Sequence, residues 1–222
     1  MNPSTQLFGQ PITLVVVLAL ISLLPFAFMS ATAFVKISTV LQIARSAIGA
    51  QSIPSSTVVM TLAAALTLLA MAPVGEQILT RVAPLLHDKQ EDVATTAQHI
   101  FTAVGEPLRG FMKANASSKE RDRFFQVAKK AQAKADSISL DADDFPVLIP
   151  AFVVTELGEA FTVGFLIFLP FLVIDLIVSN ILLALGMQML NPTQISLPFK
   201  LLLFVGIDGW GLLSQALVNG YR

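Results

Sequence analysis

Residues 160–190 read AFTVGFLIFLPFLVIDLIVSNILLALGMQML and contain a single charged residue, Asp175. About 20 apolar residues in a helix suffice to cross the hydrocarbon core of a bilayer, so this stretch is long enough to span a membrane. Pro170 lies inside it and Gly186 lies near its end, so two angled helices fit the pattern as well as one rod. The stretch predicts a helical membrane protein.

Three further apolar segments cover residues 11–35, 57–74 and 195–220. The first has no charge and is too long for the apolar part of a signal peptide, and no Lys or Arg precedes it, so a membrane helix is the preferred interpretation. Pro54 and Pro73 bracket the second segment, consistent with the start and the stop of a helix. Together with residues 160–190, these segments predict about four long apolar helices, the last two possibly broken hairpins.

The composition excludes several classes of protein. Apolar residues make up 55% of the chain and charged residues 13%, whereas a soluble domain has about 25% charged residues. The absence of cysteine excludes a disulfide scaffold and thiolate metal sites. The net charge of −1 and the lack of a basic cluster argue against nucleic acid as a partner. Because the chain has no motif for a nucleophile, a metal or a phosphate, we expect neither an enzyme nor a cofactor.

The charges concentrate between Glu76 and Asp144, which hold 21 of the 29. Apolar residues recur here at helical spacing, and Ser117-Ser118-Lys119-Glu120 matches a capping box at the start of a helix. We therefore predict three parts: an apolar helical hairpin over residues 1–74, a small polar helical domain over 75–146, and a second apolar hairpin over 147–222.

The loops suggest an orientation. The expected first loop, residues 36–56, contains Lys36 and Arg45 and no acid, so the positive-inside rule places it in the cytoplasm. The polar middle part would then face the opposite side of the membrane.

Ionisable residues inside the apolar segments are the main chemical signal. Lys200 and Asp208 lie in the last segment and Asp175 in the one before it, and a charge at a helix centre costs roughly 2.5–3.5 kcal/mol on insertion scales. These residues are easier to explain if other protein covers them, so the sequence predicts an assembly. Asp175 and Asp208 are expected to be buried acids that fix the register of subunits. Alternatively, they are the carriers of a small ion- or proton-coupled transporter.

Several motifs resemble those of the FliP/SctR family, the core export-gate subunit of type III secretion systems. They cover about residues 12–80 and 146–217 in the expected order, and the polar middle part has no matching motif. The motifs lie at residues 34–37, 45–49, 71–74, 148–156, 168–176, 184–189, 197–201 and 208–210.

The resemblance implies a structural subunit and not an enzyme. Members are all-α and assemble as about five copies, with S-type and T-type export-apparatus subunits, into a helical cone. The cone contacts further export-gate and basal-body proteins and membrane lipid, and conducts unfolded polypeptides across the bacterial inner membrane. The polar domain would face the periplasm, within the basal body. An injectisome is favoured over a flagellum, because the chain has no basic leader and a short stretch before its first apolar segment.

The resemblance also implies two sites. Met187, Gln188 and Met189 occupy the position of a methionine-rich loop that seals the channel, a role that suits flexible thioethers. Gln188 departs from the family's usual run of three methionines. Glu156 and Lys200 occupy the positions of an ion pair between neighbouring subunits, and Glu159 is left open as a competitor.

Overall fold

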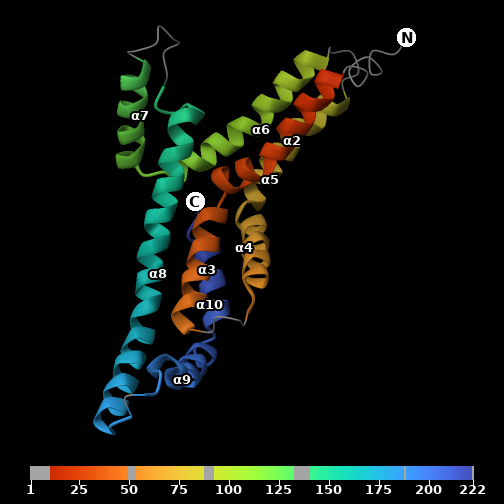
Figure 1. The fold of residues 1–222 in the computed structure, drawn as a ribbon. Helices are drawn as coiled ribbons and strands as arrows, with labels where there is room; N and C mark the ends of the chain where they lie inside the picture. Colours follow the sequence, from red (N-terminus) through yellow and green to blue (C-terminus); the bar gives the residue numbers. More distant parts are fainter. Residues whose placement is uncertain (1–10, 50–53, 88–92, 133–140, 188, 222) are drawn as a thin grey trace.

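The computed structural model describes residues 11–49, 54–87, 93–132, 141–187 and 189–221. Every regular element in these ranges is a helix, which confirms the all-α class (Figure 1). The helices are α2 (Pro11–Ala31), α3 (Phe34–Ile48), α4 (Ser56–Ala70), α5 (Ala72–His87), α6 (Val93–Asn115), α7 (Ser118–Gln132), α8 (Phe145–Ala184), α9 (Pro192–Gly206) and α10 (Gly209–Asn219).

Helix α8 is one continuous helix of 40 residues, so the predicted apolar segment starts earlier and ends sooner than expected. Asp144 precedes it, with Pro146 in the first turn, where the missing N–H is tolerated. Gly186 ends it with φ of 73°, a left-handed conformation that favours glycine. The N–H of Met187 donates to the Leu182 carbonyl over 2.9 Å, which satisfies one of the last free carbonyls of the helix.

The other three apolar segments belong to bent pairs of helices. The break in residues 195–220 is one of the two outcomes that the sequence left open, whereas the breaks between α2 and α3 and between α4 and α5 were not expected. The bends measure 82° between α2 and α3, 59° between α4 and α5, and 57° between α9 and α10. At the last break Asp208 takes φ of 52°, which Asp tolerates better than most residues. Among the described residues, α8 alone is long and apolar enough to cross a membrane by itself, or four spans result if each bent pair crosses as one.

The expected first loop is mostly helical, which corrects the prediction for residues 36–56. Helix α3 occupies residues 34–48, and Lys36 is buried in it rather than exposed in a loop. The apolar positions of α3 recur at helical spacing and pack against α8 and α4, which overrides the polar residues between them. Two charges, Lys36 and Arg45, suggested the orientation. Because Lys36 is buried, only Arg45 still supports it.

The hydrophobic core lies along α3 and extends into the polar part of the chain. Ile37 and Leu41 of α3 pack in one cluster with Phe152 of α8 and Met112 of α6. A Cβ on Gly164 of α8 would lie 2.5 Å from the Ile43 side chain, so the two helices approach closely where this glycine lies. The predicted boundary between an apolar hairpin and a polar domain therefore does not interrupt the core, and the division into three parts stays a prediction.

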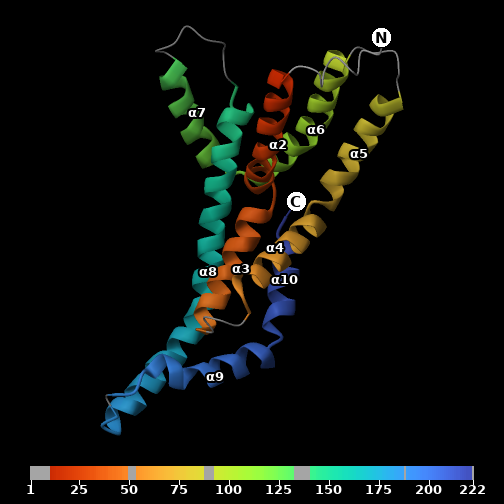
Figure 2. The ribbon, with the colours of Figure 1, turned by 45° about the vertical axis from the view of Figure 1, so that its right-hand side comes forward.

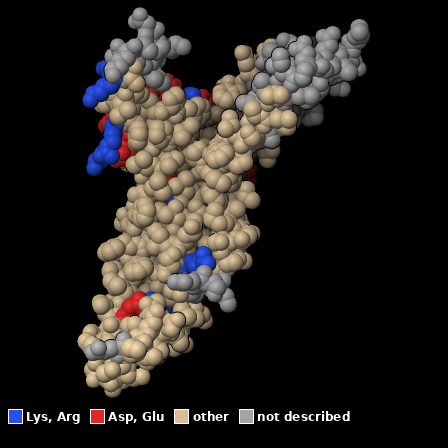
Figure 3. All heavy atoms as spheres, viewed as in Figure 1, with Lys and Arg blue, Asp and Glu red and all other residues tan. Residues whose placement is uncertain are grey.

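The molecule is forked. Helices α3, α4, α8 and α10 run together in the stem, α9 crosses its lower end, and α7 with the start of α8 and α5 with α6 form two arms (Figures 1 and 2). Charged side chains gather on the α7 arm, whereas the stem is mostly uncharged (Figure 3). The predicted cap at Ser117 forms, since the Glu120 N–H donates to the Ser117 hydroxyl over 3.3 Å. The box is not closed, because the Ser117 N–H donates to the Thr155 hydroxyl and the Glu120 carboxylate accepts from Arg123.

Candidate functional site: buried ion pairs and the α8–α9 loop

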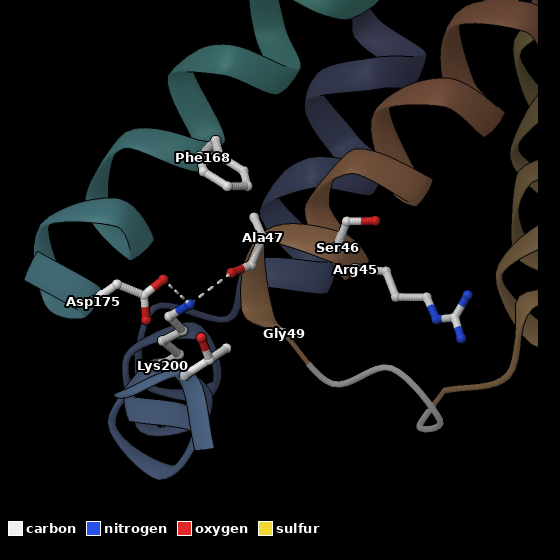
Figure 4. A pocket seen from close by; sticks show the side chains of 8 residues that line it. Arg45, Ser46, Ala47, Gly49, Phe168, Asp175 and Lys200 are labelled. Atoms are coloured by element: carbon white, nitrogen blue, oxygen red, sulfur yellow. Dashed lines mark hydrogen bonds and ion pairs between the residues drawn. The ribbon is translucent and has the colours of Figure 1, made fainter. Parts of the chain in front are cut away.

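Lys200 joins three helices near the lower end of the stem. The cap that starts α9 fixes its position, since the Asn191 side chain accepts a hydrogen bond from the Thr193 N–H and Pro192 follows. From there the Lys200 Nζ donates to Asp175 Oδ2 of α8 over 2.6 Å and to the Ala47 carbonyl of α3 over 3.3 Å (Figure 4). The side chain of Lys200 is 3% exposed, so this cation is neutralised within its own chain.

Several groups stabilise the charges at this junction. The Ala47 carbonyl lies at the C-terminal end of α3, where the helix dipole favours a cation. The hydroxyl of Ser196 donates to the second oxygen of Asp175. A polar cavity of about 440 Å³ adjoins the pair, and the side chain of Asp175 is 28% exposed towards it. The junction ties the α8–α9 hairpin to α3.

Glu156 forms a second buried cluster, higher in the stem. Its carboxyl group is fully buried, lies 3.1 Å from the Lys36 ammonium, and accepts a hydrogen bond from the Tyr221 hydroxyl. Lys36 also pairs with Glu159 at 2.7 Å, and its ammonium lies 4.4 Å from the centre of the Tyr221 ring. Burial, together with the Glu156 carboxylate, raises the pKa of Tyr221, so its hydroxyl stays a donor.

Within one chain, the structure therefore brings Glu156 and Lys200 to different partners rather than to each other. Lys36, Tyr221 and the pairing of Lys200 with Asp175 were not predicted. Asp175 and Lys200 are 25 residues apart, which no local spacing rule covers. Lys36 lies between two apolar segments, and this position was a signal in the sequence that its charge needed a partner.

Asp208 is exposed in the single chain, at the break between α9 and α10. Asp175 is half-buried. The predicted burial of both acids would thus need contacts from outside this chain. In the described ranges, no group of three or more His, Cys, Asp or Glu side chains is placed to hold a metal ion.

The loop between α8 and α9 carries the predicted methionines at the end of the hairpin. The exposed fraction is 45% for Met187 and 100% for Met189. Gln188 lies outside the described residues. Large apolar side chains on the adjoining helices are also exposed, among them Phe165, Leu202 and Val205. The loop therefore presents thioethers at the tip of an apolar surface.

The apolar span α8, the bent apolar pairs and this exposed apolar surface define an all-α membrane protein. A sequence profile of the FliP family matches residues 17–217. The chain therefore belongs to the FliP family, which confirms the resemblance seen in its motifs.

Individual relatives agree over nearly the whole chain. The chain is 39% identical to the hypersensitivity response secretion protein HrcR of Ralstonia nicotianae, over 95% of this chain and 97% of that protein. It is 42% identical to the Yop proteins translocation protein R of Yersinia pestis, over 95% and 96% respectively. It is 39% identical to the flagellar biosynthetic protein FliP of Agrobacterium fabrum, over 92% and 81%. The chain is thus a component of a type III secretion export apparatus and not an enzyme, as predicted.

Proposed function

We propose that the chain is a channel-forming subunit of the export gate, conducting unfolded polypeptides across the bacterial inner membrane. About five copies would assemble with S-type and T-type subunits and contact further basal-body proteins and lipid. The observation that carries this proposal is the fully exposed Met189 with its neighbour Met187 at the tip of the α8–α9 hairpin. The ion pair of Lys200 with Asp175 joins the two helices of that hairpin, and the hydrogen bond from Lys200 to the Ala47 carbonyl holds the hairpin to α3.

The loop would act as a gasket. Unbranched thioethers are apolar and adaptable, so a ring of them contributed by several copies can exclude water and ions yet yield around a passing chain. In a solitary chain Met189 is fully exposed to water, so its apolar side chain is not stabilised by burial. The hydrophobic effect therefore favours an arrangement in which other copies or a substrate cover it.

The pair between Glu156 and a neighbour's Lys200 stays part of the proposal and would need an exchange of partners. In one chain Asp175 neutralises Lys200, and Tyr221 covers Glu156. Assembly would have to release at least one of these contacts. Asp175 would then be the resident counter-ion of Lys200 until the neighbour arrives.

We propose that the polar helices face the periplasm, with Arg45 at the cytoplasmic end as the remaining charge signal. Because the native chain has no cysteine, Lys129→Cys and Arg45→Cys each introduce a unique thiol. We expect a membrane-impermeant thiol reagent applied from the periplasm to label the first variant and not the second. The opposite pattern would reverse the orientation.

The names of the relatives support an injectisome, since HrcR belongs to hypersensitivity response secretion and the Yersinia protein to translocation of Yop proteins. Family membership also favours export over the alternative of an ion-coupled transporter.

The gasket is tested with Met187→Cys and Met189→Cys in the assembled complex, during translocation of a substrate stalled by a folded domain. We expect both thiols to crosslink to the substrate, whereas Leu79→Cys on α5, which is 69% exposed, should not. Failure of both loop thiols in a complex of normal mass would remove the gasket while leaving the export role intact.

A further inference from the structure

A groove opens between the first turn of α7 and the face of α8 next to it, which we call the α7–α8 groove. Its volume is about 420 Å³, and Thr155, Gly158 and Thr162 of α8 line it. No atom lies within 4 Å of a Cβ built on Gly158, so the groove is open over this residue. Glu159 and Glu120 form its acidic rim, in which Glu120 is already paired with Arg123 of α7 at 2.9 Å and Glu159 carries the remaining charge.

Glu159 is only partly neutralised. The single ammonium of Lys36 is shared between Glu159 at 2.7 Å and the fully buried Glu156 at 3.1 Å. The side chain of Glu159 is 55% exposed, so a second cation can reach its carboxylate from the groove. The rim therefore favours a basic occupant.

The outer face of α7 supplies a matching basic surface, which we call the basic stripe. Lys119, Arg123 and Lys130 are spaced by four and seven residues, so all three lie on one face of the helix, and all three are exposed. Within the described residues, no ion pair or hydrogen bond engages the ammonium groups of Lys119 and Lys130. Figure 3 shows basic side chains along the outer edge of this arm.

The groove lies beside Lys119, the first residue of the stripe, and the stripe extends from there along α7 to Lys130. The Ser117 N–H donates to the Thr155 hydroxyl over 3.1 Å, which fixes the start of α7 beside the groove. A second copy rotated about an axis parallel to α8 therefore brings its stripe against this groove with little shift along the axis. Such a heterologous contact repeats around a ring or a shallow helix.

We propose that the α7–α8 groove of one copy receives the basic stripe of a neighbouring copy. The proposal rests on the self-association proposed above and specifies which faces meet in the polar part. Anionic lipid headgroups are the competing occupant of the stripe. Protein is favoured because a neighbouring copy supplies the carboxylate of Glu159, which complements the cations of the stripe.

The test uses two full-length copies with different tags, co-expressed with the partner subunits. One copy carries Thr162→Cys in the groove, and the other carries Lys119→Cys, Arg123→Cys or Lys130→Cys. Since the native chain has no cysteine and each copy has one, no disulfide can form within a copy, and the two tags identify a disulfide that joins both copies. Leu79→Cys is the matched exposed control.

We expect at least one stripe position to give a disulfide yield roughly tenfold above the control, an excess equivalent to about 1.4 kcal/mol of preference. If the tagged copies co-purify but no stripe position exceeds the control, the groove contact is wrong and the channel proposal stands. If the copies do not co-purify, both are wrong.

A second variant separates protein from lipid. Lys119→Glu with Lys130→Glu should reduce co-purification of the copies and leave binding to phosphatidylglycerol vesicles unchanged. An intact complex that has lost vesicle binding would assign the stripe to lipid and overturn the proposal.

Discussion

Lys200 and Asp175 differ in their access to water, and this difference decides how strongly the protein is destabilised when the partner of each is removed. The lysine side chain is 3% exposed and the aspartate side chain 28%. An unpaired buried charge costs far more than one that water can still reach. The same reasoning applies to Glu156, which is fully buried and has both Lys36 and Tyr221 as partners.

We expect Asp175→Asn to destabilise the protein by about 3–5 kcal/mol, because it leaves the ammonium of Lys200 buried without a counter-charge. Lys200→Met should cost less, about 1–3 kcal/mol, since the exposed part of Asp175 can be hydrated. Thermal unfolding of the detergent-purified protein measures both. The double variant should be less destabilised than Asp175→Asn alone, and equal costs for the two single variants would contradict the argument.

The ion pairs of Asp143 predict that the stability of the protein depends on pH. The hydrogen bond from Lys113, and the charges of Lys113, Arg121 and Arg109, lower the pKa of this carboxyl group. A carboxylate with a lowered pKa stabilises the folded state above its unfolded pKa of about 4, and the stabilisation disappears as the pH falls through the folded pKa. In Asp143→Asn, the fall in melting temperature between about pH 5 and 3 should be smaller than in the native chain.

At the scale of elements, the contact between α3 and α8 organises the stem. Its closest approach lies where Gly164 faces Ile43, and a Cβ at this glycine would lie 2.5 Å from the Ile43 side chain. Gly158, six residues earlier on α8, has open space instead. The two glycines therefore serve different purposes on one helix.

Gly164→Ala should destabilise the protein by about 1–3 kcal/mol, because the added methyl forces the helices apart or Ile43 out of its rotamer. Gly158→Ala is the matched control and should be neutral or stabilising by up to about 1 kcal/mol, since alanine is the better helix former. Adding Ile43→Ala to Gly164→Ala should recover part of the loss. Similar melting temperatures for the two glycine variants would show that the close approach of the helices at Gly164 does not limit the stability of the protein.

The sequence predicted elements whose signals are local. Apolar runs and the helix start at Ser117 each depend on residues a few positions apart. The bends between helices and the partners of Lys36 and Lys200 depend on where distant segments meet, which the sequence does not encode in any spacing. Helix α3 was missed because its apolar face is interrupted by polar residues and was read as a loop.

At the scale of the whole molecule, Tyr221, the last residue that the structure describes, joins four helices. Tyr221 follows α10, and its hydroxyl donates to Glu156 of α8 and lies 3.1 Å from the Ala33 carbonyl that precedes α3. Its ring lies 5.6 Å from that of Phe111 on α6. The C-terminal end thus closes the top of the stem.

Tyr221→Phe should lower the stability by about 1–3 kcal/mol, because the ring still packs but the buried carboxyl group loses a donor. Tyr221→Ala removes the ring as well and should cost more. Hydrogen exchange of α10 amides would report the release of this end. Unchanged exchange in Tyr221→Ala would show that α10 is held by its other contacts alone.

Helix α8 has a mechanical consequence. Its 40 residues make a rod about 60 Å long, twice the thickness of the hydrocarbon core of a membrane. The α7 arm holds one end of α8, and the methionine loop lies at the other end. A tilt of α8 by only about 10° about its end beside α7 would shift the loop sideways by about 10 Å, roughly the width of a helix. In the proposed channel, such a tilt would turn small adjustments among the polar arms into changes of the aperture at the loop.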